Sequence, residues 1–255
     1  MTDVAYDGLA DVYDWLVPEA LLTPEGTVAA FSGLLPLPPG GRVLDSACGI
    51  GQLAVGLALQ GFDVVASDAS PAMVQRTAQL AADRRVALSA ITCAWEDLTP
   101  ERVGASFDAV FCVGNSLTHA PGRDARRAAL GAMASVLRIE GLLVLTSRNW
   151  ERQRRRGSGL EIADQLVERR GRRGFVVYSW TIPDAWDARH DLDVGVALID
   201  ASGKATTVTE RLPFWPFTHS ELEADLRRSG FTPESSTYTE EVDRYLVTAR
   251  RSTSP

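Results

Sequence analysis

Short apolar runs alternate with helical spacing through the first 150 residues of the chain. Each run has the length of a strand, and several lack a polar face, as strands do that are covered on both sides. Strands that alternate with helices predict βαβ units and a parallel sheet. The predicted strands are 42–48, 62–68, 86–92, 107–114 and 141–148, and the predicted helices are 52–60, 71–82 and 123–137.

The pattern changes on both sides of this alternating stretch. Residues 1–35 have helical spacing interrupted by prolines, which predicts an N-terminal helical cap. Beyond the fifth strand, segments separated by turn signals predict an antiparallel insertion over 151–217. A capping box, Thr218-His-Ser-Glu221, then begins a helix that precedes a closing strand pair. We therefore expect a core made of 1–150 and 218–255, with the insertion between them.

Composition and charge narrow the class of protein. The 255 residues are 45% hydrophobic and 23% charged, which excludes a disordered or collagen-like chain. The net charge of −7 argues against nucleic acid as the main partner, because phosphate binding needs a basic face. Cys48, Cys93 and Cys112 are spread singly with no histidine at metal-ligand spacing, so we expect no metal site. Without a signal pattern or an apolar run of about 20 residues, we expect a cytoplasmic protein with no membrane partner.

A glycine-rich turn, Asp45-Ser-Ala-Cys-Gly49-Ile-Gly51, follows the first predicted strand. Such turns let the backbone approach a ligand at the carboxyl edge of an open α/β sheet. Gly49 to Ala54 also fits the dinucleotide pattern G-x-G-x-x-G/A. The carboxylate of Asp45 is unfavourable for a pyrophosphate, however, and suits a cationic ligand group. Asp68, at the end of the second strand, can accept both ribose hydroxyls of either kind of ligand.

A set of motifs resembles one enzyme family. Val43-Leu-Asp-Ser-Ala-Cys-Gly-Ile-Gly51 is similar to the first motif of class I S-adenosylmethionine-dependent methyltransferases. More narrowly, it resembles the D-x-A-C-G-x-G of the glycine/sarcosine N-methyltransferase group. The resemblance implies a Rossmann-like α/β fold with a seven-stranded sheet, helices on both faces and an antiparallel β insertion after strand five. Further matches follow in order at Ser67-Asp-Ala-Ser-Pro-Ala-Met73, Cys93-Ala-Trp-Glu-Asp-Leu98, Val113-Gly-Asn-Ser-Leu-Thr-His119 and Ser147-Arg-Asn-Trp150, where Glu151 replaces the family's aspartate.

The resemblance also implies roles for individual residues. Asn115 and His119 would be catalytic, with His119 either a proton acceptor or a structural residue. Arg148, Tyr13 and Asn149 would bind the substrate, and the arginine would grip a carboxylate with its planar fork. S-adenosyl-L-methionine would be the cofactor, held by Asp45, Ala47, Gly49, Gly51, Asp68, Ala69, Met73, Ala94, Trp95, Cys112 and Val113.

The expected reaction moves a methyl group to an amine nitrogen of a small, carboxylate-bearing molecule. That acceptor is glycine- or sarcosine-like, or a peptide or natural-product scaffold. The alternatives are a small-molecule O-methyltransferase, a dinucleotide-dependent oxidoreductase and a cofactor-binding protein without turnover. The aromatic residues of the insertion region either indicate a larger or more apolar acceptor than glycine, or form the core of the insertion. They are Trp180, Trp186, Phe214, Trp215 and Phe217.

Overall fold

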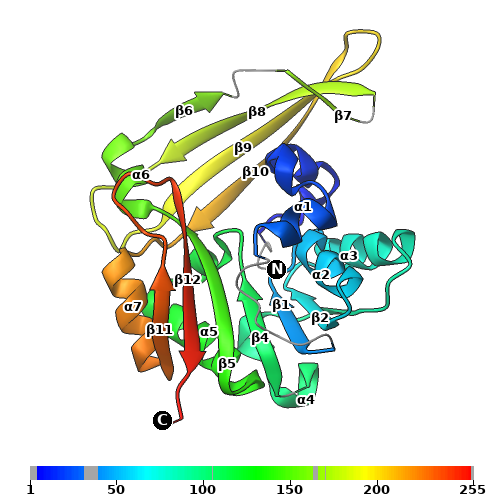
Figure 1. Cartoon of the computed structure of the whole chain (residues 1–255). Helices are drawn as coiled ribbons and strands as arrows, with labels where there is room; N and C mark the ends of the chain where they lie inside the picture. Colours follow the sequence, from blue (N-terminus) through cyan, green and yellow to red (C-terminus); the bar gives the residue numbers. More distant parts are fainter. Residues whose placement is uncertain (1–4, 32–39, 105, 163–165, 170, 254–255) are drawn as a thin grey trace.

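The structure is a computed structural model that describes residues 5–31, 40–104, 106–162, 166–169 and 171–253. Its larger sheet has the strand order β11-β12-β5-β4-β1-β2-β3 (Figure 1). Neighbouring strands from β5 to β3 are parallel, whereas β12 runs antiparallel to both β5 and β11. The strands are β1 (Arg42–Ser46), β2 (Asp63–Asp68), β3 (Ser89–Thr92), β4 (Phe107–Cys112), β5 (Leu137–Arg148), β11 (Phe231–Ser236) and β12 (Arg244–Arg251).

Helices cover both faces of this sheet, as predicted. Successive strand residues point to opposite faces, so Val43 and Leu44 enter different cores although both are fully buried. The apolar runs are continuous because neither face of the central strands meets water. One face carries α1 (Pro24–Ala29), α2 (Gln52–Leu59) and α3 (Pro71–Asp83), and the other carries α4 (Pro100–Val103), α5 (Arg123–Val136) and α7 (His219–Arg228).

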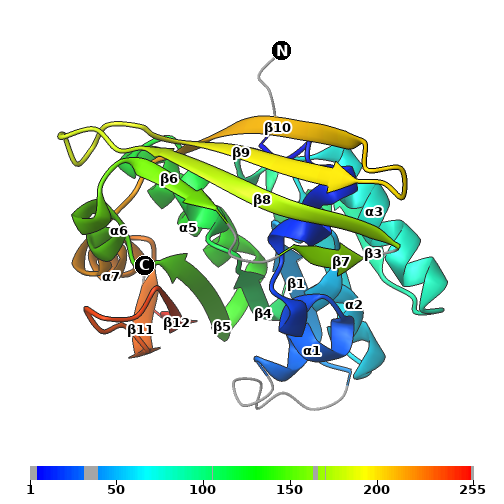
Figure 2. The same ribbon diagram turned by 90° about the horizontal axis from the view of Figure 1, so that it is seen from above.

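A second, antiparallel sheet forms after β5 and the short helix α6 (Trp150–Arg156). Its order is β10-β9-β8-β6, with β7 also paired to β8. Figures 1 and 2 show this sheet lying across the carboxyl edge of the parallel strands, above the N-terminal segment. The strands are β6 (Gly159–Ile162), β7 (Val167–Arg169), β8 (Arg172–Thr181), β9 (His190–Ile199) and β10 (Ala205–Phe214).

The main departures from the predicted elements have local causes. The N-terminal region forms two 3-10 helices, Ala10–Leu16 and Glu19–Leu21, before α1, because Pro18 and Pro24 interrupt a longer helix. The parts of the predicted cap at 1–4 and 32–35 lie outside the described residues. The arginine- and glycine-rich stretch after α6 contains β6 and β7, which turn signals alone did not predict.

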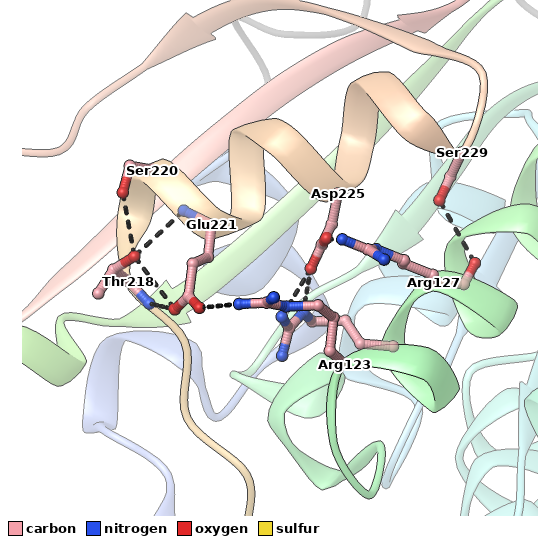
Figure 3. A network of polar contacts seen from close by, with 8 residues as sticks. Arg123, Arg127, Thr218, Ser220, Glu221, Asp225 and Ser229 are labelled. Atoms are coloured by element: carbon pink, nitrogen blue, oxygen red, sulfur yellow. Dashed lines mark hydrogen bonds and ion pairs between the residues drawn. The ribbon is translucent and has the colours of Figure 1, made fainter. Parts of the chain in front are cut away.

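Buried polar contacts join α5 to α7 (Figure 3). Arg126 and Asp225 are 3% and 1% exposed and form an ion pair at 2.6 Å, while Arg127 binds the other carboxylate oxygen at 2.7 Å. The predicted capping box is present: the Thr218 hydroxyl accepts from the Glu221 amide, and the Glu221 carboxylate accepts from the Thr218 amide. These contacts fix the helix that leads into the closing strands.

Candidate active site

The carboxylate of Asp45 is buried at the end of β1 without a well-formed hydrogen bond. It is 1% exposed, and no donor in the described part of the chain reaches either oxygen with full hydrogen-bond geometry. Burial, and secondly the charge of Asp68, raise the pKa of Asp45 to about 7, although the backbone amide of Ala54 acts in the opposite direction. A buried carboxylate without a counter-charge is unfavourable, so this position suits a cationic ligand group.

The two glycines of the turn after β1 differ in their surroundings. Gly51 has φ +81°, and a Cβ there would lie 2.7 Å from the side chain of Thr77 on α3. Gly51 therefore lets α2 and α3 pack closely. Gly49, at φ +54°, has open space, with Tyr13 Cε1 4.0 Å from an added Cβ. Ala47 shares the left-handed conformation at φ +68°, which gives the turn its sharp bend.

Asp68 lies beside this turn at the end of β2. Its carboxylate accepts from the backbone amides of Gly49 and Ser70, both at 2.9 Å. Burial raises its pKa, while amides including that of Ala69 oppose the shift. Ser70 then caps α3 by accepting from the Met73 amide at 3.1 Å. Since each carboxylate oxygen can accept more than one hydrogen bond, Asp68 is oriented and still able to bind ribose hydroxyls.

The remaining predicted cofactor residues surround the turn at different depths. Met73 is 2% exposed and packs with Ile50 beneath the N-terminal tyrosines. Trp95 donates from Nε1 to Ser46 Oγ at 3.0 Å and so joins the segment after β3 to the end of β1. Ala94 and Val113 are half-buried. Cys112 is fully buried in the core, where burial raises its thiol pKa.

Asn115 connects the ends of β4 and β5. It has φ +73°, and its side-chain oxygen accepts from the Arg148 amide at 2.8 Å. Arg148 donates to Gln153 Oε1 at 2.8 Å, and its guanidinium lies 5.0 Å from the centre of the Trp180 ring. Burial, and then the nearby Arg244, lower the pKa of Arg148 to about 10. The structure thus holds Arg148 at the carboxyl edge of the sheet.

The side chain of Asn149 is buried next to Arg148 and hydrogen-bonds to the backbone of two segments at this edge of the sheet. It is 1% exposed, and its oxygen caps α6 by accepting from the Arg152 amide at 3.0 Å. Its Nδ2 donates to the carbonyl oxygens of Thr239 and Glu240. These contacts join α6 to the segment before β12 and use both polar atoms of the Asn149 side chain, whose predicted role in substrate binding stays a prediction.

His119 and two tyrosines of the N-terminal segment form an aromatic cluster. His119 Nδ1 lies 2.8 Å from the carbonyl oxygen of Pro213, which can only accept, so Nδ1 donates. Nε2 is then free to accept from the Tyr6 hydroxyl at 3.3 Å. Burial lowers the pKa of His119 to about 4, so its ring is neutral near pH 7. Tyr13 meets Tyr6 edge to face at 5.4 Å.

Two neighbours of this cluster were missed by sequence reasoning. Tyr178 lies on the inner face of β8, since it shares the side of Val176 and Trp180. Arg244 begins β12 directly opposite Arg148. The alternation of β8 could have identified the first, whereas pairing between strands about a hundred residues apart left no local signal for the second.

Part of this chain is similar in sequence to known methyltransferases. Residues 43–141 match a family model described as a methyltransferase domain. The glycine/sarcosine N-methyltransferase of Parasynechococcus marenigrum (strain WH8102) is 39% identical over 118 residues, which are 46% of this chain and 42% of that protein. The chain thus aligns with less than half the length of this curated relative.

Solved structures extend the likeness to the whole fold. A S-adenosylmethionine-dependent methyltransferase from Clostridium acetobutylicum ATCC 824 superposes with a TM-score of 0.77 at 14% identity, covering 97% of this chain and 99% of that one. CalS10, an amino pentose methyltransferase from Micromonospora echinaspora, gives a TM-score of 0.71 at 19% identity, covering 99% of this chain and 100% of that one. The resemblance stated from the motifs and the class I methyltransferase fold are both confirmed.

Proposed function

We propose that this protein is a methyltransferase that uses S-adenosyl-L-methionine to methylate an amine nitrogen of a small, carboxylate-bearing molecule. The observation that carries the proposal is the buried carboxylate of Asp45 at the carboxyl edge of the sheet, which has no cationic partner among the described residues. It supports a cationic donor over a dinucleotide, whose pyrophosphate would meet a negative charge there. Asp68, with its two backbone donors, supports a ribose site beside it.

S-adenosylmethionine supplies a methyl group that is activated by the positive charge on its sulfur. The residues proposed to hold it are those of the turn after β1, together with Asp68, Ala69, Met73, Ala94, Trp95, Cys112 and Val113. Asp45 would neutralise a cationic part of the ligand. Cys112 would contribute through its backbone, because its side chain points into the core.

The acceptor site is proposed at Arg148, with Tyr13 nearby on the N-terminal segment. Asn115 fixes the backbone of Arg148, and Gln153 orients its guanidinium, so a carboxylate would meet a preformed fork. Such positioning, together with exclusion of water by the half-buried tyrosines Tyr6 and Tyr13, is the protein's main contribution to a displacement reaction. The neutral ring of His119 is able to take a proton only through Tyr6, because Nδ1 is bonded to Pro213.

The proposed setting is the reducing cytoplasm. All three cysteines are free thiols, as expected for that compartment. Among the helices in the described part of the chain, none has the length and hydrophobicity needed to cross a membrane. The division into a core of 1–150 and 218–255 and a substrate-side insertion of 151–217 belongs to the same proposal.

Methyl transfer to defined amines tests this function. The protein is incubated with donor carrying a deuterated methyl group and with glycine, sarcosine, amino sugars and short peptides, and the products are analysed by mass spectrometry. We expect labelled N-methyl product from a carboxylate-bearing amine. Arg148→Gln should raise the acceptor KM about tenfold or more while leaving S-adenosylhomocysteine affinity unchanged. Label on a hydroxyl oxygen alone, or an unchanged KM in the variant, would contradict the proposal.

A further inference from the structure

Two arginines stand side by side at the proposed acceptor site. Arg148 ends β5 and Arg244 begins β12, and the antiparallel register pairs them directly. Residues paired in this way have their Cβ atoms about 5 Å apart on the same face of the sheet, where like charges repel. The pairing therefore puts two positive charges next to each other at a functional edge.

Neither of these guanidinium groups forms an ion pair within the described residues. Two arginines of the adjacent helix α6, in contrast, do form ion pairs: Arg152 and Arg156 both bind Asp243, at 2.9 and 2.8 Å. The carboxylate next to Arg244 in the chain is thus already shared between two other arginines. Glu161 of β6 and Asp243 act on Arg148 through their charges, and Glu161 is itself exposed to solvent.

The charge of Arg244 affects residues around the proposed acceptor site, although its side chain is exposed. Its charge lowers the pKa values of Tyr6, Tyr13 and Tyr178, against the raising effect of burial. These tyrosines come from the N-terminal segment and from β8, and the charge of Arg148 lowers the pKa values of Tyr6 and Tyr178 as well. This effect agrees with the strand register, which places Arg244 directly opposite Arg148.

We propose that Arg148 and Arg244 form a two-arginine subsite for acceptors that carry two negative charges near the amine, such as two carboxylates or a phosphate. This inference rests on the proposed function and refines its substrate class. A single carboxylate would neutralise Arg148 and leave Arg244 uncompensated beside it. Two anionic charges would neutralise both guanidinium groups, and each guanidinium can bind an oxyanion with two parallel hydrogen bonds.

Anion binding tests this subsite without knowledge of the natural acceptor. Malonate, inorganic phosphate and acetate are titrated by calorimetry into the complex with S-adenosylhomocysteine at constant ionic strength. We expect malonate or phosphate to bind at least tenfold more tightly than acetate. Arg244→Gln should abolish this preference, and Arg244→Lys should restore part of it because the charge remains. Arg250→Gln is the matched control, since Arg250 lies at the far end of the same strand and pairs with Glu234.

The outcomes separate this inference from the proposed function. Equal affinity for malonate, phosphate and acetate in the unaltered protein, or undiminished preference in Arg244→Gln, would overturn the two-arginine subsite. Binding of S-adenosylhomocysteine and labelled methyl transfer, measured on the same preparations, would then still uphold the methyltransferase. If that ligand itself fails to bind, the proposed function is rejected directly.

Discussion

The ionisation of Asp45 is the feature of single residues that bears most on function. Its carboxyl group has a pKa of about 7 in the folded protein, against about 4 in an unfolded chain. Between these values the folded state binds more protons than the unfolded state, so stability falls as the pH rises. The cost is complete above pH 7, where the buried group must carry its charge. A cationic ligand would remove this destabilisation. The instability of the ligand-free protein above pH 7 and its affinity for a cationic ligand therefore have the same cause.

Replacing Asp45 by Asn should therefore change stability in a pH-dependent way. At pH 8 we expect the ligand-free variant to be more stable than the unaltered protein by a few kcal/mol, because the buried charge is gone. Near pH 4 the difference should disappear, since Asp45 is then protonated when folded. Thermal unfolding across this range measures the effect. A difference in Tm that does not vary with pH would contradict the assigned pKa.

Replacing either glycine of the turn after β1 by alanine should have a different effect, one on stability and the other on ligand binding. Gly51→Ala should destabilise the fold by about 2 kcal/mol or more, because its Cβ meets Thr77 at 2.7 Å in a left-handed conformation. Gly49→Ala meets only Tyr13, at 4.0 Å, and should cost less stability. It should instead weaken binding of S-adenosylhomocysteine. Urea unfolding and calorimetry of both variants test the distinction, which equal losses of stability would refute.

Local sequence located most of the strand-end residues but not their partners. Asp45, Asp68, Asn115 and Arg148 were predicted because each follows an apolar run, and parallel strands bring such ends to one edge. Arg244 was missed because its place depends on the register of an antiparallel pair that local patterns do not encode.

At the scale of elements, prediction was best where periodicity was strongest. The helix predicted at 71–82 is observed as Pro71–Asp83, begun by Pro71 and capped by Ser70. The third strand was predicted from residue 86, but β3 begins at Ser89 because it pairs only with β2 at the sheet edge. The alternation of apolar and polar residues in this strand is weak, so the position where it begins depends on its pairing with β2.

The attachment of α7 to α5 gives a prediction at this scale. Asp225→Asn should cost about 3–5 kcal/mol of unfolding free energy, because it leaves Arg126 buried without a counter-charge. Glu223→Gln is the control on the same helix: it removes an exposed pair with Arg227 and should cost about 0.5 kcal/mol or less. Chemical denaturation measures both. Similar losses for the two variants would show that the α5–α7 contact is not a buried ion pair in solution.

At the scale of the whole molecule, the N-terminal segment joins the two sheets across the proposed site. Tyr6 donates its backbone amide to Glu210 of β10 at 2.6 Å, and Asp7 accepts from Ser70 beside the proposed ribose position at 2.6 Å. Arg169 of β7 binds the carbonyl oxygen of Val17 at 3.2 Å. The segment therefore contacts the second sheet and the residues that follow β2, beside the proposed site.

The central claim is that the buried carboxylate of Asp45 receives a cationic methyl donor and not a dinucleotide. The most direct measurement is calorimetric titration of the unaltered protein at pH 8 with S-adenosylhomocysteine and, separately, with NADH and NADPH. We predict saturable binding of S-adenosylhomocysteine and none of either nicotinamide cofactor. Tight binding of a nicotinamide cofactor, with no heat from S-adenosylhomocysteine, would contradict the account.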